Sequence, residues 1–437
     1  MTTERRLERD LPQILGDLAM GPYPDYIDDV LATTAHRRQR PAWTFPERWL
    51  PMDLATNAVP EAPRIPWRIV AVLALLLVLV AAMLAFYVGA PQRLPAPFGP
   101  AANGSVVFTA GGDIYTVDPV TGEASAIVVG PETDREPVYS RDGTRVAFER
   151  KIEGGGGLGP GMLFVVQDDG RGLLQVTPEP LSGLGSWSFS PDGHTIVALA
   201  TRSTGLAIMI VPSDGSGSPA FFDVGATLDN DVPPQYRPDG AEIMFVGRQP
   251  GTATRGLYAL DPTTGDVRTI IAPVATADVH LASWSPDGTR IAYAVYDPNA
   301  AVTSSRTHVV ATDGSGDILV DTHPDSIADV GTVWSNDGTR LIVARLHAGN
   351  AGDILQSAIV PADGSNVGIE VDCPPGALPA NCSADWMWSP DDTVLIAAPP
   401  NAGNQLLPPL LADPLTGRIR SAPWSANGDP TWERRAP

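Results

Sequence analysis

Apolar runs of strand length alternate with short polar turns along the C-terminal three quarters of the chain. One turn cassette recurs six times within this pattern, as SRDGTRVAF (Ser140–Phe148), SPDGHTIVA (Ser190–Ala198), RPDGAEIMF (Arg237–Phe245), SPDGTRIAY (Ser285–Tyr293), SNDGTRLIV (Ser335–Val343) and SPDDTVLIA (Ser389–Ala397). Successive cassettes are 50, 47, 48, 50 and 54 residues apart, measured between Asp142, Asp192, Asp239, Asp287, Asp337 and Asp391. A period near fifty residues with strand-like sequence on both sides is typical of propeller blades. The pattern therefore predicts an all-β propeller.

Two further series of positions allow the blades to be counted. The strand before each cassette ends in an aromatic residue, namely Tyr139, Phe189, Tyr236, Trp284, Trp334 and Trp388, and Pro430–Trp432 repeats this ending without a cassette after it. A second hairpin series, out of phase with the first, ends at Gly122, Gly170, Gly215, Gly265, Gly314, Gly364 and Gly417. We expect seven blades, the first taking its outer three strands from Val106–Val129 and its innermost strand from Pro430–Trp432. Six blades is the alternative if the last repeat, which Pro408 and Pro409 interrupt, is not a blade.

The cassette aspartates have two readings, as turn formers or as a calcium-binding series. Ser-Pro-Asp-Gly suits a hairpin turn, because Pro sets φ at the second position and Gly takes the left-handed conformation at the fourth. A cation needs about 6–8 oxygens that converge on one point, and the cassettes are spread over the whole repeat region. We expect these aspartates to form turns and no metal to be bound.

A run of 22 residues, Ile69–Ala90, carries neither a charge nor a proline. Such a run is long enough to cross the ~30 Å hydrocarbon core of a bilayer as a helix. Arg64 and Arg68 precede it, so the positive-inside rule places residues 1–66 in the cytoplasm and residues 106–437 outside. We expect a single-pass anchor over residues 67–90 in a bacterial cell membrane. A cleaved signal peptide is the competing reading, but the apolar run is longer and starts later than such peptides do.

The segments on either side of the predicted anchor are short. Residues 91–105 are rich in Pro and Ala and predict a stiff spacer. In residues 1–66, Leu7–Met20 and Asp25–Arg40 have helical spacing of apolar residues, and the second begins with acids and ends with bases, which suits a helix dipole. This tail either docks a cytosolic partner or lies on the inner leaflet without one.

Charge is distributed unevenly. The chain carries −21 in total, and residues 1–68 contribute only −1, from 9 basic and 10 acidic residues. The remaining −20 repels phosphate backbones and argues against nucleic-acid binding. The chain has two cysteines, Cys373 and Cys382, and on the outer side of a membrane such a pair predicts a disulfide.

The repeated aromatic–Ser–Pro–Asp–Gly cassette, as in WSPDGTRIAY, resembles the TolB-type β-propeller repeat of the PD40 class, and the resemblance covers about residues 106–432. It implies periplasmic or extracytoplasmic protein binding, or a non-catalytic gating propeller fused to a serine peptidase. The chain departs from TolB in having a predicted anchor in place of a cleaved signal. Its linker of 15 residues also leaves no room for the N-terminal α/β domain of that family.

Linear catalytic motifs are absent. The sequence contains no G-x-S-x-G, H-E-x-x-H, Walker loop or G-x-G-x-x-G, and its six histidines are scattered. We therefore expect no catalytic residue, no metal and no cofactor, and a protein that is not an enzyme. A propeller enzyme with a site assembled from dispersed loops is an open alternative.

The candidate binding residues are acids just upstream of the innermost strands, which should ring one mouth of the central channel: Glu136, Asp231, Asp329, Asp385 and Asp429. They could equally be ordinary solvated loop acids. The sequence thus predicts a membrane-anchored propeller that binds a protein, peptide or envelope ligand. The alternatives are an anti-sigma-like regulator that signals through its tail and the loop-built enzyme.

Overall fold

The computed structural model forms two compact units, residues 1–91 and residues 92–437. The structure describes residues 32, 71–77, 96, 98–151, 161–177, 181, 183–203, 205–228, 232–296, 305–323, 326–347, 354–373, 381–382, 385–398 and 405–436. Within the predicted anchor, residues 71–77 are helical. Among the described residues no helix is both long and apolar enough to span a bilayer. The rest of the predicted anchor and the helical patches of the tail lie outside the described residues, apart from residue 32, so both stay predictions.

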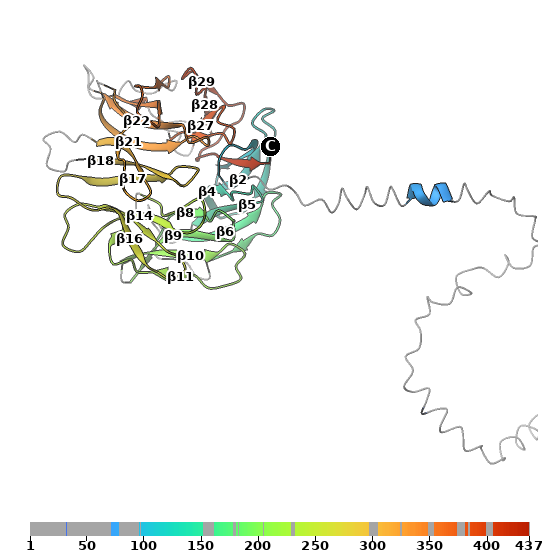
Figure 1. Cartoon of the computed structure of the whole chain (residues 1–437). Helices are drawn as coiled ribbons and strands as arrows, with labels where there is room; N and C mark the ends of the chain where they lie inside the picture. Colours follow the sequence, from blue (N-terminus) through green and yellow to red (C-terminus); the bar gives the residue numbers. More distant parts are fainter. Residues whose placement is uncertain are drawn as a thin grey trace, which may run out of the picture. The chain divides into compact units, whose positions relative to one another are not determined.

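The second unit is built from seven antiparallel sheets that follow one another around a ring in chain order (Figure 1). The first three sheets are β1 (Ala102–Ala110), β2 (Asp113–Val117), β3 (Ala124–Val128) with β30 (Thr431–Arg435); β4 (Thr133–Tyr139), β5 (Arg145–Lys151), β6 (Gly161–Gln167), β7 (Leu174–Gln175); and β8 (Leu184–Phe189), β9 (Thr195–Arg202), β10 (Gly205–Pro212), β11 (Ala220–Phe222). Each sheet is one blade, so the predicted all-β propeller is confirmed.

Blades 4 to 7 repeat this plan with two additions. They comprise β12 (Thr227–Leu228), β13 (Gln235–Tyr236), β14 (Ile243–Arg248), β15 (Gly256–Leu260), β16 (Val267–Ile271); β17 (Asp278–Trp284), β18 (Arg290–Tyr296), β19 (Ser305–Ala311), β20 (Ile318–Leu319); β21 (Ser326–Trp334), β22 (Arg340–His347), β23 (Ile354–Pro361), β24 (Ile369–Glu370), β25 (Asn381–Cys382); and β26 (Met387–Trp388), β27 (Leu395–Ala397), β28 (Leu410–Ala412), β29 (Ile419–Ser421). In blade 4 both β12 and β13 pair with β14, and in blade 6 the short β25 runs parallel to β23. Because β26–β29 form a complete sheet, the six-blade alternative is wrong.

Blade 1 joins strands from the two ends of the repeat region. Strand β30 pairs antiparallel with β1, with Trp432 opposite Val106 and Thr431 opposite Val107. The predicted closure is therefore confirmed. It leaves β1 without a free edge, which removes a site at which another chain could add a strand.

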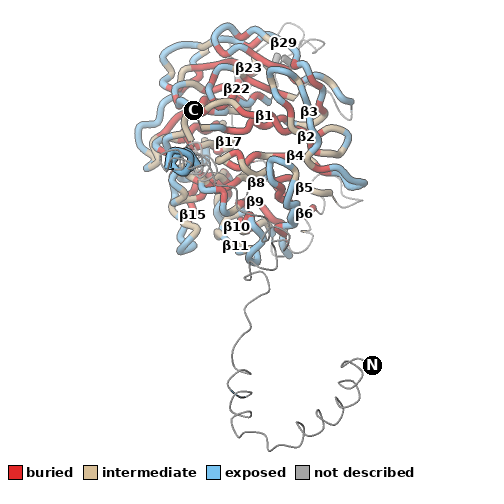
Figure 2. Tube along the Cα trace, turned by 90° about the vertical axis from the view of Figure 1, so that its right-hand side faces the viewer, coloured by how far each residue is buried: buried red, intermediate tan, exposed pale blue. Residues whose placement is uncertain are grey.

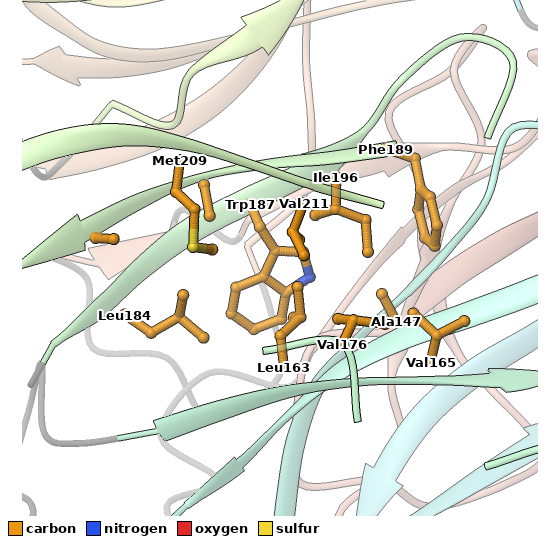
Figure 3. Packing of buried hydrophobic residues seen from close by; sticks show 12 residues of the cluster. Ala147, Leu163, Val165, Val176, Leu184, Trp187, Phe189, Ile196, Met209 and Val211 are labelled. Atoms are coloured by element: carbon orange, nitrogen blue, oxygen red, sulfur yellow. The ribbon is translucent and has the colours of Figure 1, made fainter. Parts of the chain in front are cut away.

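Apolar side chains fill every interface between neighbouring blades. Seven buried clusters occur among the described residues, each drawn from two adjacent blades, including blades 7 and 1. Figure 3 shows the cluster between blades 2 and 3, where Trp187 packs among Leu163, Ile196 and Met209. The middle strands are buried on both faces, whereas the hairpins at the rim are exposed (Figure 2). Each fully buried aliphatic side chain contributes about 1.5–3 kcal/mol.

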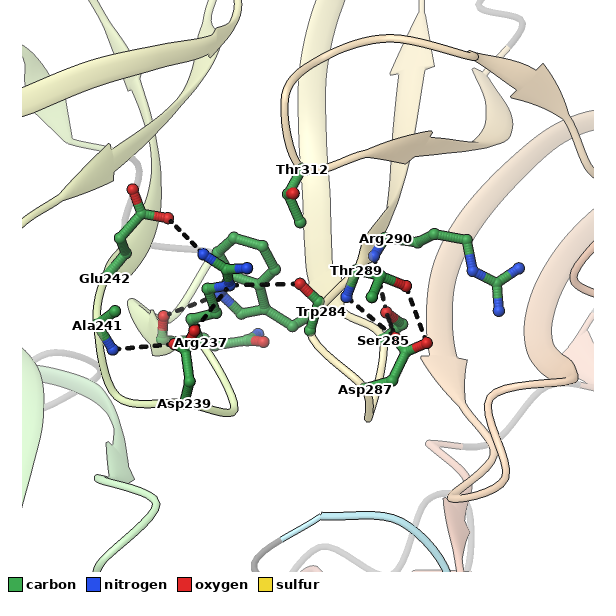
Figure 4. Close-up of polar contacts among 12 residues, drawn as sticks. Arg237, Asp239, Ala241, Glu242, Trp284, Ser285, Asp287, Thr289, Arg290 and Thr312 are labelled. Atoms are coloured by element: carbon green, nitrogen blue, oxygen red, sulfur yellow. Dashed lines mark hydrogen bonds and ion pairs between the residues drawn. The ribbon is translucent and has the colours of Figure 1, made fainter.

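The cassettes form the turns that the sequence predicts. In Ser285–Tyr293, the Ser285 hydroxyl donates to Asp287 at 2.6 Å and accepts the Arg290 N–H at 2.9 Å, while Asp287 accepts the Thr289 N–H at 3.0 Å (Figure 4). The fourth residue is a glycine in five cassettes, and Gly288 has φ +68°. Burial alone would raise the pKa of Asp287, but the hydrogen bonds from Ser285 and Thr289 outweigh it and lower that pKa. The aspartates act as turn formers.

Candidate functional site

The innermost strands define two mouths of the central channel. In the blades that carry Glu136, Asp385 and Asp429, the acid precedes the aromatic end of the innermost strand, and in blades 2 to 7 a cassette follows that aromatic end. The acids therefore lie at one end of the channel and the cassettes at the other. We call these ends the acid mouth (Glu136, Asp385 and Asp429) and the cassette mouth.

The acid mouth brings together carboxyl groups from blades 7, 1 and 2. Loss of hydration raises the pKa of Asp429, and the charge of Asp385 raises it further. Loss of hydration also raises the pKa of Glu136, to which the charges of Glu149 and Asp429 add, against the lowering effect of Arg135. Asp385 and Asp429 also line a cavity of about 230 Å³ beside Trp386. Repulsion therefore links Asp385 with Asp429 and Asp429 with Glu136, while Glu136 also forms an ion pair of 3.3 Å with Arg135.

Only part of this ring of acids matches the sequence-based expectation. Asp329 is fully buried, and its carboxylate accepts the Thr307 N–H at 2.8 Å, so it does not open on the mouth. A buried carboxylate needs hydrogen-bond donors, and Asp329 in β21 receives this one from the backbone of β19. The bond therefore joins the two strands. Asp231 lies outside the described residues. Cys373 is disulfide-bonded, and the chain's other cysteine, Cys382, lies in β25.

A fully buried ion pair lies next to Asp329, between blades 5 and 6. Arg345 donates to Asp321 through Nε at 2.7 Å and through Nη2 at 2.8 Å, and both side chains are 0% exposed. Nη2 also donates to the Val367 carbonyl at 2.9 Å. Burial would raise the pKa of Asp321, but the bonds from Arg345 and from the His323 N–H hold it below its usual value. This pair fixes the blade interface.

The cassette mouth opens into a larger cavity of about 390 Å³ in the channel. Its wall includes the aromatic ends of six innermost strands: Phe189, Tyr236, Trp284, Trp334, Trp388 and Trp432. Three of the indoles donate to the backbone of the preceding blade, as Trp388 does to the Val333 carbonyl at 3.2 Å. The Nε1 of Trp432 has no hydrogen-bond partner among the described residues.

Two arginines line the same cavity, and the search for sequence motifs missed both. The second cassette position is Pro in four blades but is Arg141 in blade 2 and Asn336 in blade 6. Arg434 has the same spacing from Trp432 that Arg141 has from Tyr139, so it takes this position in blade 1. The departure from Pro was the available signal, because this position faces the channel, where Pro286 and Pro390 also line the cavity.

The linker covers these arginines. Arg434 donates through Nη2 to the carbonyl of Ala96, at 3.2 Å, and to that of Gly99, and through Nη1 to Asn336 Oδ1 at 2.8 Å. The guanidinium carbon of Arg141 lies 4.4 Å from the ring centre of Phe98. Burial and the nearby charge of Arg434 lower the pKa of Arg141 to about 10, so it is still a cation at neutral pH.

Comparison with known proteins places this geometry in context. No protein-family model matches the chain. The chain is similar to an oligogalacturonate lyase from Vibrio parahaemolyticus, with a TM-score of 0.51 and 16% identity over 73% of this chain and 86% of that one. The chain is a seven-bladed β-propeller. The resemblance of this propeller to TolB-type repeats is confirmed at the level of the fold.

Two further similarities were found. The chain is similar to TolB from Acinetobacter baumannii, with a TM-score of 0.44 and 16% identity over 77% of this chain and 81% of TolB. Over 138 residues the chain is 27% identical to dipeptidyl-peptidase 5 from Porphyromonas gingivalis. That segment is 29% of this chain and 20% of the peptidase, so the chain spans a small part of this relative's length.

These findings correct one expectation from the sequence. The absence of linear catalytic motifs led us to expect that the protein is not an enzyme, and that deduction is wrong. A lyase with this fold and a peptidase with partial sequence similarity are both enzymes by name. A propeller gathers side chains from seven blades at one axis, so a catalytic site on it leaves no linear motif.

Proposed function

We propose that the propeller is a ligand-binding domain tethered to a membrane by residues 67–90, and that its acid mouth recognises a basic segment of a protein or peptide. The observation that carries this is the meeting of Glu136, Asp385 and Asp429 from three blades. Among the described residues, neither Asp385 nor Asp429 forms an ion pair. Loss of hydration, and after it repulsion from neighbouring carboxylates, raises the pKa of Glu136 and of Asp429, and a cationic ligand would relieve that repulsion.

The charge of the whole chain supports the same partner. The residues after the first 68 carry −20, and such a field raises the association rate of basic ligands, most strongly at low salt. Two carboxyl groups at the mouth are also positioned beside a cavity of about 230 Å³, which can receive a side chain.

The test is a titration of the full-length chain in detergent with a fluorescent hexa-arginine peptide, followed by anisotropy. Asp385→Asn and Asp429→Asn should each weaken binding about two- to tenfold, and salt should weaken it further. Asp266→Asn, on an exposed outer hairpin, is the matched control and should leave the dissociation constant unchanged. Equal losses in the control and the mouth variants would show that the peptide responds to net charge alone and not to the acid mouth.

A second candidate function rests on the raised pKa values. A raised carboxyl pKa suits general acid catalysis, and the pKa values of Asp429 and Glu136 are both raised above the ordinary carboxyl value. Screening the full-length chain against peptide and acidic-glycan substrates would test it. Turnover that Asp429→Asn abolishes, with peptide binding reduced no more than in Asp385→Asn, would favour the enzyme.

The membrane tether has its own test, which does not depend on either site. Replacing Leu75 and Leu76 with Lys should release the protein from the membrane fraction, because a charged residue at the centre of a spanning helix costs about 2.5–3.5 kcal/mol. Unchanged fractionation would count against the anchor.

A further inference from the structure

The cassette-mouth cavity contains positive charge that the described structure does not neutralise. Neither Arg141 nor Arg434 forms an ion pair with any described residue, although acids outnumber bases in the chain by 50 to 29. Arg434 is 6% exposed, and its Nε has no hydrogen-bond partner among the described residues. A buried guanidinium without a carboxylate is costly, so the buried Arg434, with the half-buried Arg141 at the same cavity, indicates a site made for an anion.

The nearest carboxylate to these arginines is already committed elsewhere. Asp392 is close enough to Arg434 to influence its pKa, but its oxygens accept the Asn336 N–H at 2.7 Å, the Asn336 amide at 2.9 Å and the Asp337 N–H at 2.8 Å. Burial raises the pKa of Asp392 in spite of these bonds. It therefore acts as a clamp on the neighbouring turn, and the Nε of Arg434 remains available.

The remaining wall determines what kind of anion fits. Trp284, Trp334 and Trp388 already donate their indole N–H groups to backbone carbonyls, so they offer only apolar surface to the cavity. Trp432 differs, because its Nε1 is buried and has no partner in the described part of the chain. The cavity thus combines aromatic walls with residues on blades 1 and 2, Arg434 and Trp432 of blade 1 and Arg141 of blade 2, that carry cationic or unpartnered N–H groups. A volume of about 390 Å³ lies within the usual range for small-molecule sites, ~300–1,000 Å³.

We propose that the cassette-mouth cavity binds a small organic carboxylate with a flat apolar body, held by Arg141, Arg434 and the indole N–H of Trp432. A carboxylate has two oxygens that can accept from donors on different residues of one cavity wall. Nη1 and Nη2 of Arg434 already donate to Asn336 and the linker, so Nε is the Arg434 donor left for the ligand. The aromatic walls then pack against the rest of the ligand. The site is at the opposite end of the channel from the acid mouth, so it does not depend on the function proposed above.

The linker takes part in this site. Phe98 lies over Arg141 and also lines the cavity, so the ligand is enclosed between the linker and the inner strands. Phe98 is part of the wall of this cavity of about 390 Å³, so a ligand of the size of benzoate fits without displacement of the linker.

The test uses the full-length chain in detergent and isothermal titration with benzoate. We expect saturable binding that is at least about tenfold weaker for benzamide, its neutral counterpart, and for inorganic phosphate, which lacks the apolar body. Arg141→Gln should weaken benzoate binding at least about tenfold. Arg171→Gln, which alters an exposed arginine on an outer hairpin of the same blade, is the control and should leave it unchanged.

Arg141→Pro guards against a folding artefact. It restores the residue found at this position in four other cassettes, and no backbone hydrogen bond from the Arg141 N–H occurs among the described residues, so the turn should form as before. This variant should lose benzoate binding while it retains the thermal stability of the wild type. The proposal is overturned if benzoate fails to bind at ~10 mM, if benzamide or phosphate binds equally well, or if both Arg141 variants bind benzoate like the wild type.

Discussion

Removing one partner of the buried ion pair between blades 5 and 6, Asp321 with Arg345, should destabilise the propeller more than the loss of any exposed charge. In Asp321→Asn the carboxylate becomes an amide, and Arg345 loses the charge that balances it. Both side chains are 0% exposed, and two hydrogen bonds of 2.7 Å and 2.8 Å join them. The partners that remain are the Val367 carbonyl, which carries no formal charge, and the Glu370 carboxylate, which is 43% exposed and 3.8 Å from Nη1. Breaking a buried pair in this way costs about 3–5 kcal/mol.

The assay is urea denaturation followed by tryptophan fluorescence, with Asp169→Asn as the matched control. Asp169 forms an exposed ion pair with Arg171, whose side chain is 84% exposed, so its loss should cost less than about 1 kcal/mol. Replacing both partners together, as Asp321→Leu with Arg345→Met, should recover most of the lost stability, because no buried charge then remains. If Asp321→Asn is no more costly than Asp169→Asn, the reasoning about burial is refuted.

The same pair predicts how stability depends on pH. The folded-state pKa of Asp321 is lowered, so the pair's contribution is complete above the ordinary carboxyl pKa and is lost as the pH falls through the lowered value. The unfolding free energy of the wild type should therefore decrease in acid more steeply than that of the Leu/Met double variant. Parallel curves for the two proteins would contradict this.

Three further variants test the closure, the clamp and the acid mouth. Trp432→Ala should lower the free energy of unfolding in urea by about 3–5 kcal/mol, because Trp432 is 8% exposed in the cluster between blades 7 and 1. The control is Leu415→Ala, which removes a 73% exposed side chain. A loss as small as that of the control would argue against the closure as a major source of stability. Asp392→Gly relieves the strain of a backbone φ of +60° but removes the acceptor of three hydrogen bonds. We expect the stability measured by thermal unfolding to fall by about 1–2 kcal/mol. A gain in stability would show that the backbone strain dominates. Because the pKa of Asp429 is raised in the folded state, the wild type should lose stability as the pH rises from the ordinary carboxyl pKa through the raised value. In Asp429→Asn, the unfolding free energy from urea denaturation should depend less on pH over that interval. An unchanged pH profile would contradict the repulsion at the acid mouth.

The blade count could be predicted from sequence because its causes are local. The cassette turns are held by residues within the cassettes, Ser, Asp and Gly in four of the six, and Gly143 and Gly193 adopt the left-handed φ that the motif requires. The closure by β30 also followed, since Trp432 repeats an aromatic position whose period was already known.

The composition of the channel could not be predicted in the same way. Arg141 and Arg434 are 293 positions apart in sequence, and only the closed ring brings them to one cavity. Asp329 lies five residues before the aromatic end of its strand, whereas the acids of the acid mouth lie three residues before theirs. Thr307 on a different strand offers Asp329 a backbone donor, and its side chain is buried. Such partners depend on which strands become neighbours, and a single sequence does not encode that in any short motif.

The pairing of β30 with β1 also determines when the ring can be completed during synthesis. Blades 2 to 7 each use one contiguous stretch of chain and can form as that stretch leaves the ribosome. Blade 1 must wait, with the inner edge of β1 open, until residues 431–435 have been made about 320 positions later. During that interval the nascent chain exposes an unpaired strand edge, and shielding this edge is the task that a chaperone or an early partner would have to perform.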